Sequence, residues 1–161
     1  MLGQKVLLNQ MPIAIKDSKI DISSEETTKE LAKDLTHYLK GGEIVYLYGE
    51  MGVGKTTFVR YLINQFQKNK KLHITEVTSP TFNLLNEYDI NDLVIKHYDL
   101  FRLKDESEIT NLDLFENNQN TITLIEWPQL ISKNKSIKTI DLIFSYENEL
   151  NNRSVKIDGL N

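Results

Sequence analysis

The chain has 161 residues, and its 19 Lys and Arg against 23 Asp and Glu give a formal net charge of −4. With 40% hydrophobic and 26% charged residues, the composition is that of a folded globular protein and excludes intrinsic disorder. The sequence contains no cysteine, which excludes disulfides, thiolate metal sites and a cysteine nucleophile.

The length predicts a single domain over 21–161, preceded by residues 1–20 as an N-terminal extension or a first strand. No apolar run approaches the ~18 residues of a membrane span, and the first residues lack the cleavage site of a signal peptide. We therefore expect a cytoplasmic protein with no membrane partner.

The first predicted element is a helix over about 24–40. Leucines recur every four residues on one of its faces, at Leu31, Leu35 and Leu39. Ser23 and Glu26 have the spacing of a capping box, in which two side chains satisfy free N–H groups at the start of a helix. Gly41-Gly42 is expected to end the helix.

The next segment combines a strand, a glycine-rich turn and a helix. The run IVYLY at 44–48 is continuously apolar and contains β-branched and aromatic residues, which predicts a strand buried on both faces. A second helix is predicted over about 55–67, because Phe58, Leu62 and Phe66 share one face.

Beyond about residue 72 the pattern predicts strands, at about 81–88, 93–98, 121–126, 137–145 and 153–157. The short link 89–92 is rich in turn residues and predicts an antiparallel hairpin, and a second hairpin is expected around 147–152. Segment 105–117 is expected to be helical in pieces. The elements together predict an α/β domain with a mixed parallel and antiparallel sheet flanked by helices.

The turn after the first predicted strand matches a phosphate-binding motif. Residues 49–56, GEMGVGKT, fit G-x-x-x-x-G-K-[ST] without exception. Its glycines allow successive N–H groups to turn inward around an anion, and the following helix directs its positive end at the same place. We assign this phosphate cradle to Gly49, Gly52, Val53 and Gly54. The domain is therefore predicted to be P-loop NTPase-like.

Three side chains at the start of the second helix complete the phosphate site. Lys55 is expected to reach the β- and γ-phosphates, Thr56 to ligate Mg²⁺ through its hydroxyl, and Thr57 to help hold the α-phosphate. The cofactors expected are ATP and Mg²⁺.

Magnesium also needs a carboxylate from the end of a neighbouring strand. Glu126 ends the apolar strand TITLIE and Asp99 follows LVIKHY, so each is either a metal or catalytic partner or a structural cap. The Ser79 hydroxyl is expected either to reach the γ-phosphate or its metal, or to belong to an ordinary turn before a strand. Trp127 is interpreted as a nucleotide neighbour, an anchor for a partner or a half-buried core residue, and His97 as a core histidine.

Other classes of P-loop protein fit the sequence poorly. The N-K-x-D motif that reads guanine is absent. Nucleoside-phosphate kinases usually carry several arginines, and the sequence has only three, Arg60, Arg102 and Arg153. The negative net charge argues against binding DNA. The remaining interpretation is a small ATPase that drives a partner.

Four segments in order, YLYGEMGVGKTTF, TSPTFNLLNEY, HYDLFRL and IEWPQ, resemble the bacterial TsaE family of transfer-RNA threonylcarbamoyladenosine biosynthesis. The resemblance runs from about Glu25 to Arg153. It implies a weak, partner-dependent Mg²⁺-ATPase that acts with a TsaD-like transferase subunit and its inactive TsaB-like paralogue. Those partners modify the adenosine beside the anticodon, and transfer RNA is contacted only through the complex.

The resemblance also implies roles for individual residues. Lys55, Thr56 and Thr57 match phosphate and metal contacts, Glu126 matches a Mg²⁺ ligand and Asp99 a metal or catalytic residue. Further nucleotide contacts are matched by Glu25, Thr28, Gln129 and Arg153. For Arg153 a plain surface role stays open. Two other functions also stay open, a small-molecule kinase and a nucleotide-gated adaptor with negligible hydrolysis.

Overall fold

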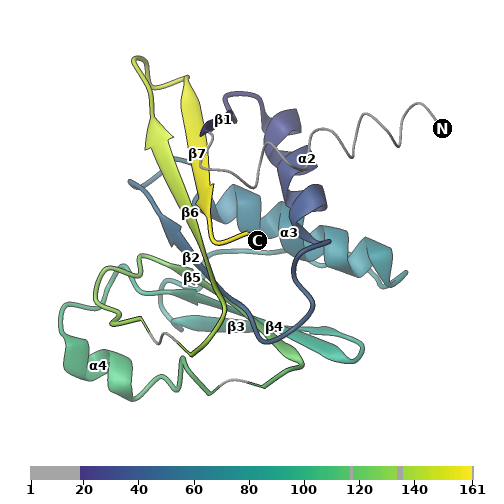
Figure 1. The fold of residues 1–161 in the computed structure, drawn as a ribbon, viewed down its shortest axis with the longest axis vertical. Helices are drawn as coiled ribbons and strands as arrows, with labels where there is room; N and C mark the ends of the chain where they lie inside the picture. The colour runs from purple at the N-terminus through teal and green to yellow at the C-terminus, as the bar shows by residue number, and fades with distance from the viewer. Residues whose placement is uncertain (1–18, 117, 134–135, 161) are drawn as a thin grey trace.

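The structure is a computed structural model and describes residues 19–116, 118–133 and 136–160 (Figure 1). Its strands form one seven-stranded sheet in the order β1-β7-β6-β2-β5-β4-β3. The strands are β1 (Lys19–Asp21), β2 (Ile44–Tyr48), β3 (Leu85–Ile90), β4 (Leu93–Asp99), β5 (Thr121–Glu126), β6 (Thr139–Tyr146) and β7 (Arg153–Asp158). The helices are α2 (Glu25–Leu35), α3 (Lys55–Asn69) and α4 (Glu106–Thr110).

The sheet is mixed, as predicted. β2 lies at its centre and runs parallel to β5 and β6, and β4 runs parallel to β5. The outer pairs β3–β4, β6–β7 and β1–β7 are antiparallel. The carboxyl ends of β2, β4 and β5 therefore meet at one edge, where ligands bind in open α/β sheets.

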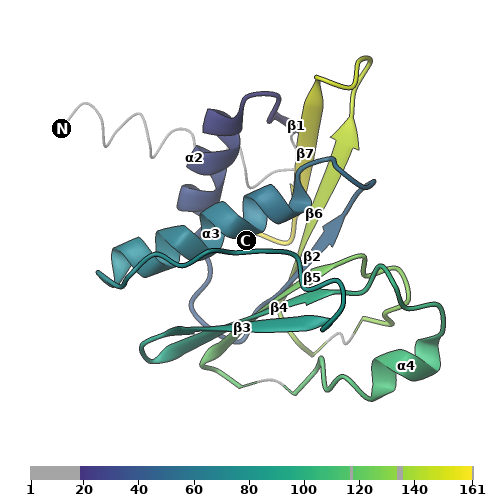
Figure 2. The same ribbon diagram turned by 180° about the vertical axis from the view of Figure 1, so that it is seen from behind.

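Each face of the sheet carries its own apolar core, because successive side chains of a strand point to opposite faces. Val45 and Leu47 of β2 pack in the core that α2 and α3 cover. Ile44 and Tyr46 pack in a second core with Leu114 and other residues that follow β4. Figures 1 and 2 show α2 beside α3, with α4 away from both. Burial on both faces explains the continuous apolar run IVYLY.

Two local predictions at the start of elements were wrong. No side-chain hydrogen bond caps α2 at Ser24, and the Ser23 hydroxyl instead accepts a hydrogen bond from the Arg153 N–H at 2.9 Å. The predicted strand over 81–88 begins only at Leu85, because residues 81–84 form a turn closed by the Leu84 N–H and the Pro80 carbonyl at 2.7 Å.

The first helix ends at Leu35 and not near residue 40, with a turn over 36–38. The expectation for residues 1–18 lies outside the described residues. In the described part of the chain, no helix has the length and apolar character needed to cross a membrane.

Gly41 has a backbone that only glycine adopts readily, and this yields a prediction for stability. Its φ is +127°, and a Cβ there would lie 1.9 Å from the Gln119 carbonyl oxygen. Gly41→Ala should therefore lower the free energy of unfolding by about 3 kcal/mol in denaturant titrations. Lys40→Ala, an exposed neighbouring change, is the control, and equal midpoints for the two variants would contradict this account.

Candidate functional site

The phosphate-binding loop connects the end of β2 to the start of α3. Its glycines take positive φ values of 147° at Gly49, 78° at Gly52 and 115° at Gly54. A Cβ on Gly49 would come within 2.9 Å of the Phe144 carbonyl oxygen, so the tight path of the loop requires glycine there. Val53 is fully buried and anchors the loop to the core.

The first turn of α3 is free to bind an anion. The helix begins after Gly54, which supplies no side-chain cap, and the first turn contains no acidic residue. The backbone N–H groups of a helix start need acceptors, and they carry partial positive charge. An uncapped start behind a glycine-rich loop is the geometry that binds phosphate.

Lys55 is the first residue of α3, and its ammonium group lies against the phosphate-binding loop. Its ammonium group donates to the Gly49 carbonyl and sits 3.7 Å from the centroid of the Trp127 ring. Burial lowers the pKa of Lys55, while the nearby charges of Glu126 and Asp99 act in the opposite direction. Trp127 also packs against Phe101, with ring centroids 4.8 Å apart and the ring planes tilted by 52°. Trp127 packs against the second core, as expected of a half-buried core residue, and its contact with Lys55 also places it beside the phosphate-binding loop.

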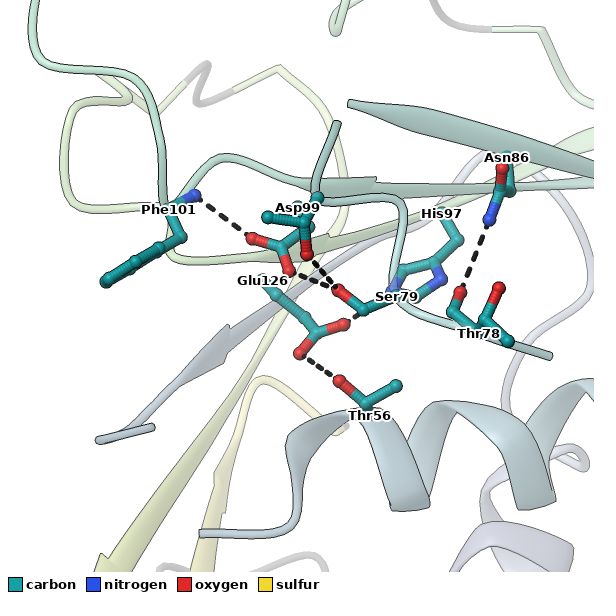
Figure 3. A network of polar contacts seen from close by, with 9 residues as sticks. Thr56, Thr78, Ser79, Asn86, His97, Asp99, Phe101 and Glu126 are labelled. Atoms are coloured by element: carbon teal, nitrogen blue, oxygen red, sulfur yellow. Dashed lines mark hydrogen bonds and ion pairs between the residues drawn. The ribbon is translucent and has the colours of Figure 1, made fainter. Parts of the chain in front are cut away.

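Glu126 and Asp99 face the loop from the ends of adjacent strands. They are directly paired in the parallel register of β4 and β5. Glu126 accepts a hydrogen bond from the Thr56 hydroxyl at 2.9 Å through Oε1 (Figure 3). The structure therefore joins a carboxylate and a hydroxyl that are 70 residues apart in the chain.

Both carboxylate oxygens of Asp99 are held by the protein. Oδ2 accepts from the Ser79 hydroxyl at 2.5 Å, and Oδ1 accepts from the Phe101 N–H at 3.0 Å. The Ser79 hydroxyl also lies 3.1 Å from that of Thr81. Ser79 therefore contacts Asp99 in this structure, and its predicted contact with a γ-phosphate stays a prediction.

His97 is a neighbour of the site that the sequence analysis missed. It is fully buried, as expected of a core histidine, but its Nε2 lies 2.6 Å from Glu126 Oε2. The available signal was the alternation along β4, since His97 lies two residues before Asp99 and so shares its face.

A small cavity of about 180 Å³ lies next to the loop and brings together residues from three segments of the chain, 22–28, 53–57 and Arg153. It is lined by Ile22, Glu25, Thr28, Val53, Gly54, Thr57 and Arg153. Glu25 is tied to α3, since it accepts from the Tyr61 hydroxyl at 2.5 Å and pairs with Arg60 at 3.2 Å. The sequence had assigned most of these residues to the nucleotide.

Arg153 reaches the loop from β7. A Cβ built on Gly54 would lie 3.5 Å from its Nη1, and its buried Nε has no hydrogen-bond partner in the described residues. An unpaired guanidinium N–H beside a phosphate loop suits an anion. This placement favours the nucleotide role of Arg153 over a plain surface role.

Of the four further nucleotide contacts implied by the resemblance, Gln129 is the one that does not line this cavity. It is exposed in the turn after β5. A larger hollow of about 810 Å³ lies beside α4, is lined in part by Glu106, Leu114 and Leu130, and contains none of the predicted site residues.

The donor groups at the loop fit Mg²⁺ bound together with a nucleotide. Among the described residues, no cluster of three or more His, Asp or Glu side chains could hold a metal by itself. Nucleotide-bound Mg²⁺ does not need one, because phosphates and waters supply most of its oxygen ligands. The Thr56 hydroxyl and the Glu126 carboxylate are oxygen donors beside the phosphate-binding loop, and they fit the remaining ligand positions of Mg²⁺.

A family model described as threonylcarbamoyl adenosine biosynthesis protein TsaE matches residues 22–155. The tRNA threonylcarbamoyladenosine biosynthesis proteins TsaE of Rickettsia conorii and Bacillus subtilis are 44% and 36% identical to the chain, over 68% and 74% of its length. These matches cover 61% of the Rickettsia conorii protein and 72% of the Bacillus subtilis protein, and a match to the Rickettsia felis protein covers 62% of it.

A crystal structure of Bacillus subtilis YdiB has the same fold, with a TM-score of 0.66 and 21% sequence identity. The superposition covers 91% of this chain and 88% of that one. The predicted α/β fold class is therefore confirmed.

Proposed function

The chain belongs to the family of threonylcarbamoyl adenosine biosynthesis proteins TsaE, and we propose that it is a Mg²⁺-dependent ATPase that supports threonylcarbamoylation of transfer RNA. The observation that carries this proposal is the hydrogen bond from the Thr56 hydroxyl to Glu126 at 2.9 Å. Thr56 belongs to the first turn of α3, which has no side-chain cap. A phosphate loop, a metal-binding hydroxyl and an acid on a neighbouring strand are the parts that nucleotide hydrolysis requires.

In this proposal the loop amides and Lys55 hold the phosphates, and Lys55 exchanges the Gly49 carbonyl for a phosphate oxygen. Thr56 and Glu126 hold Mg²⁺, which when bound neutralises charge on the β- and γ-phosphates. Asp99, opposite Glu126, is the candidate to orient a water on the metal or the attacking water. Chemistry of this kind depends on positioning and charge more than on covalent catalysis.

The remaining nucleotide contacts are assigned by position. Glu25 and Thr28 line the cavity beside the loop, where we place the nucleoside, and Arg153 supplies an unpaired N–H next to Gly54. Gln129 remains a proposal from the family resemblance, since it lies outside this cavity.

We further propose that hydrolysis is weak in the isolated chain and serves a complex. The partners would be a TsaD-like transferase subunit and its inactive TsaB-like paralogue, in the cytoplasm where bacterial transfer RNA is modified. The test is reconstitution of the modification with those subunits. Multiple rounds of modification should require both this chain and hydrolysable ATP. Equal turnover of the modification without this chain would contradict the proposal.

Direct binding of transfer RNA by this chain should be weak. The net charge is −4, and the one basic cluster noted in the sequence, Lys68, Lys70 and Lys71, lies at the end of α3 away from the loop. Few phosphate contacts give little affinity at physiological salt. An electrophoretic shift at ~150 mM salt should show no tight complex. Submicromolar binding with a steep salt dependence would instead make the lysine cluster a binding site.

A further inference from the structure

We propose that His97 is a positioning residue that fixes the Glu126 carboxylate for Mg²⁺. The inference deepens the proposed function and rests on it, because it concerns a residue that stands behind the candidate metal ligand. His97 would touch neither nucleotide nor metal. Its contribution would come from one contact, between Nε2 and Glu126 Oε2 at 2.6 Å (Figure 3).

The strand register explains how His97 reaches Glu126. In the parallel pairing of β4 and β5, His97 lies opposite Leu124, and Asp99 lies opposite Glu126. His97 and Glu126 are therefore diagonal neighbours on one face of the sheet, a separation that a long side chain can bridge. The contact joins two directly paired strands, β4 and β5, and does not depend on a loop.

The two oxygens of Glu126 have separate partners on separate elements. Oε2 contacts His97 of β4, and Oε1 accepts from Thr56 of α3. Two contacts from different directions fix the rotation of the carboxylate, which a single contact leaves free. Because Thr56 is also the candidate metal-binding hydroxyl, the orientation set by His97 directs Oε1 to the metal position.

Burial requires a donor at this place. The side chains of His97 and Glu126 are 0% and 2% exposed, so water cannot replace the contact. An ionised carboxylate only accepts hydrogen bonds, so Nε2 must carry the proton. Nδ1 has no partner in the described residues, and the neutral tautomer with a proton on Nε2 leaves only an acceptor unpaired there.

The test measures Mg²⁺ affinity by titrating the metal into the ADP-bound protein, with calorimetry as the readout. His97→Leu should weaken Mg²⁺ binding by about 10- to 100-fold, the range found when the neighbour of a metal ligand is removed. The affinity for ADP without metal should stay the same, because the loop holds the phosphates. His37→Leu, an exposed change after α2, is the matched control.

Two more variants separate positioning from general stability. His97→Gln places an amide donor near the same position and should restore most of the Mg²⁺ affinity, whereas the shorter His97→Asn should not. In a Glu126→Ala background, His97→Leu should cause no further loss of Mg²⁺ affinity, because a residue that acts only through Glu126 has no effect once Glu126 is removed. If His97→Leu does not fold, the comparison of Gln with Asn carries the test.

Unchanged Mg²⁺ affinity in His97→Leu or His97→Asn, with only a lower melting temperature, would overturn the proposal and make His97 a structural residue. Additive losses in the Glu126→Ala background would also overturn it. Absence of Mg²⁺-dependent binding in the wild-type protein would be a different result, since it contradicts the proposed function itself.

Discussion

Lys55→Ala should weaken ATP binding by about 1.5–3 kcal/mol, or roughly 10- to 150-fold. The ammonium group would make charge-assisted contacts to the β- and γ-phosphates, and Arg153 is the only Lys or Arg among the described residues that line the cavity beside the loop. Burial already lowers the pKa of Lys55, which means that the folded site disfavours this charge without a ligand. The fold should therefore survive the change.

Calorimetric titration with ATP and Mg²⁺ measures this effect. Lys70→Ala removes a charge just beyond the other end of α3 and serves as the matched control. A melting temperature close to that of the wild type shows that the variant is folded. Unchanged ATP affinity in such a folded Lys55→Ala variant would exclude the loop as the nucleotide site.

Glu126→Ala should lower the turnover of Mg²⁺-ATP by about 100-fold or more, while ATP affinity falls by less than about 10-fold. The loop and Lys55 still hold the phosphates in this variant, so the loss falls on the hydrolytic step. The Glu126 side chain is 2% exposed, accepts a hydrogen bond from Thr56 and contacts His97. Its removal therefore also leaves these two polar groups without their partner.

Melting temperature and turnover, measured in one preparation, decide what Glu126 does. Lost turnover in a folded variant supports the metal role, and intact turnover with a lower melting temperature makes Glu126 a structural cap. Asp99→Ala is the parallel variant. A larger turnover defect there would make Asp99 the principal ligand, even though its two oxygens are held by Ser79 and Phe101 in this structure.

Features with a strong local physical cause were predictable from the sequence. The strand 44–48 followed from burial on both faces, and the loop 49–56 followed from glycines whose positive φ values the structure contains. The mixed sheet was also predicted. The Ser23–Glu26 capping box was wrong because Ser23 has a competing partner, Arg153, 130 residues away. A local motif carries no information about such a partner.

The same limit applies to the site. The sequence placed acids at the ends of two strands, but the direct pairing of Asp99 with Glu126 depends on which strands are neighbours. The alternation along β4 places His97 on the same face as Asp99, but its contact with Glu126 depends on the strand register as well. The start of β3 at Leu85 was missed because polar and apolar residues alternate over 81–84 as they do in a strand.

Phosphate release from ATP and Mg²⁺ by the purified chain, measured with and without the two transferase partners, tests the central claim most directly. Slow release by the chain alone, abolished in Lys55→Ala and raised by the partners, is the predicted result. Release that requires a small-molecule acceptor would indicate a kinase. Tight ATP binding with no release, even in the presence of both partners, would indicate a nucleotide-gated adaptor and contradict the account.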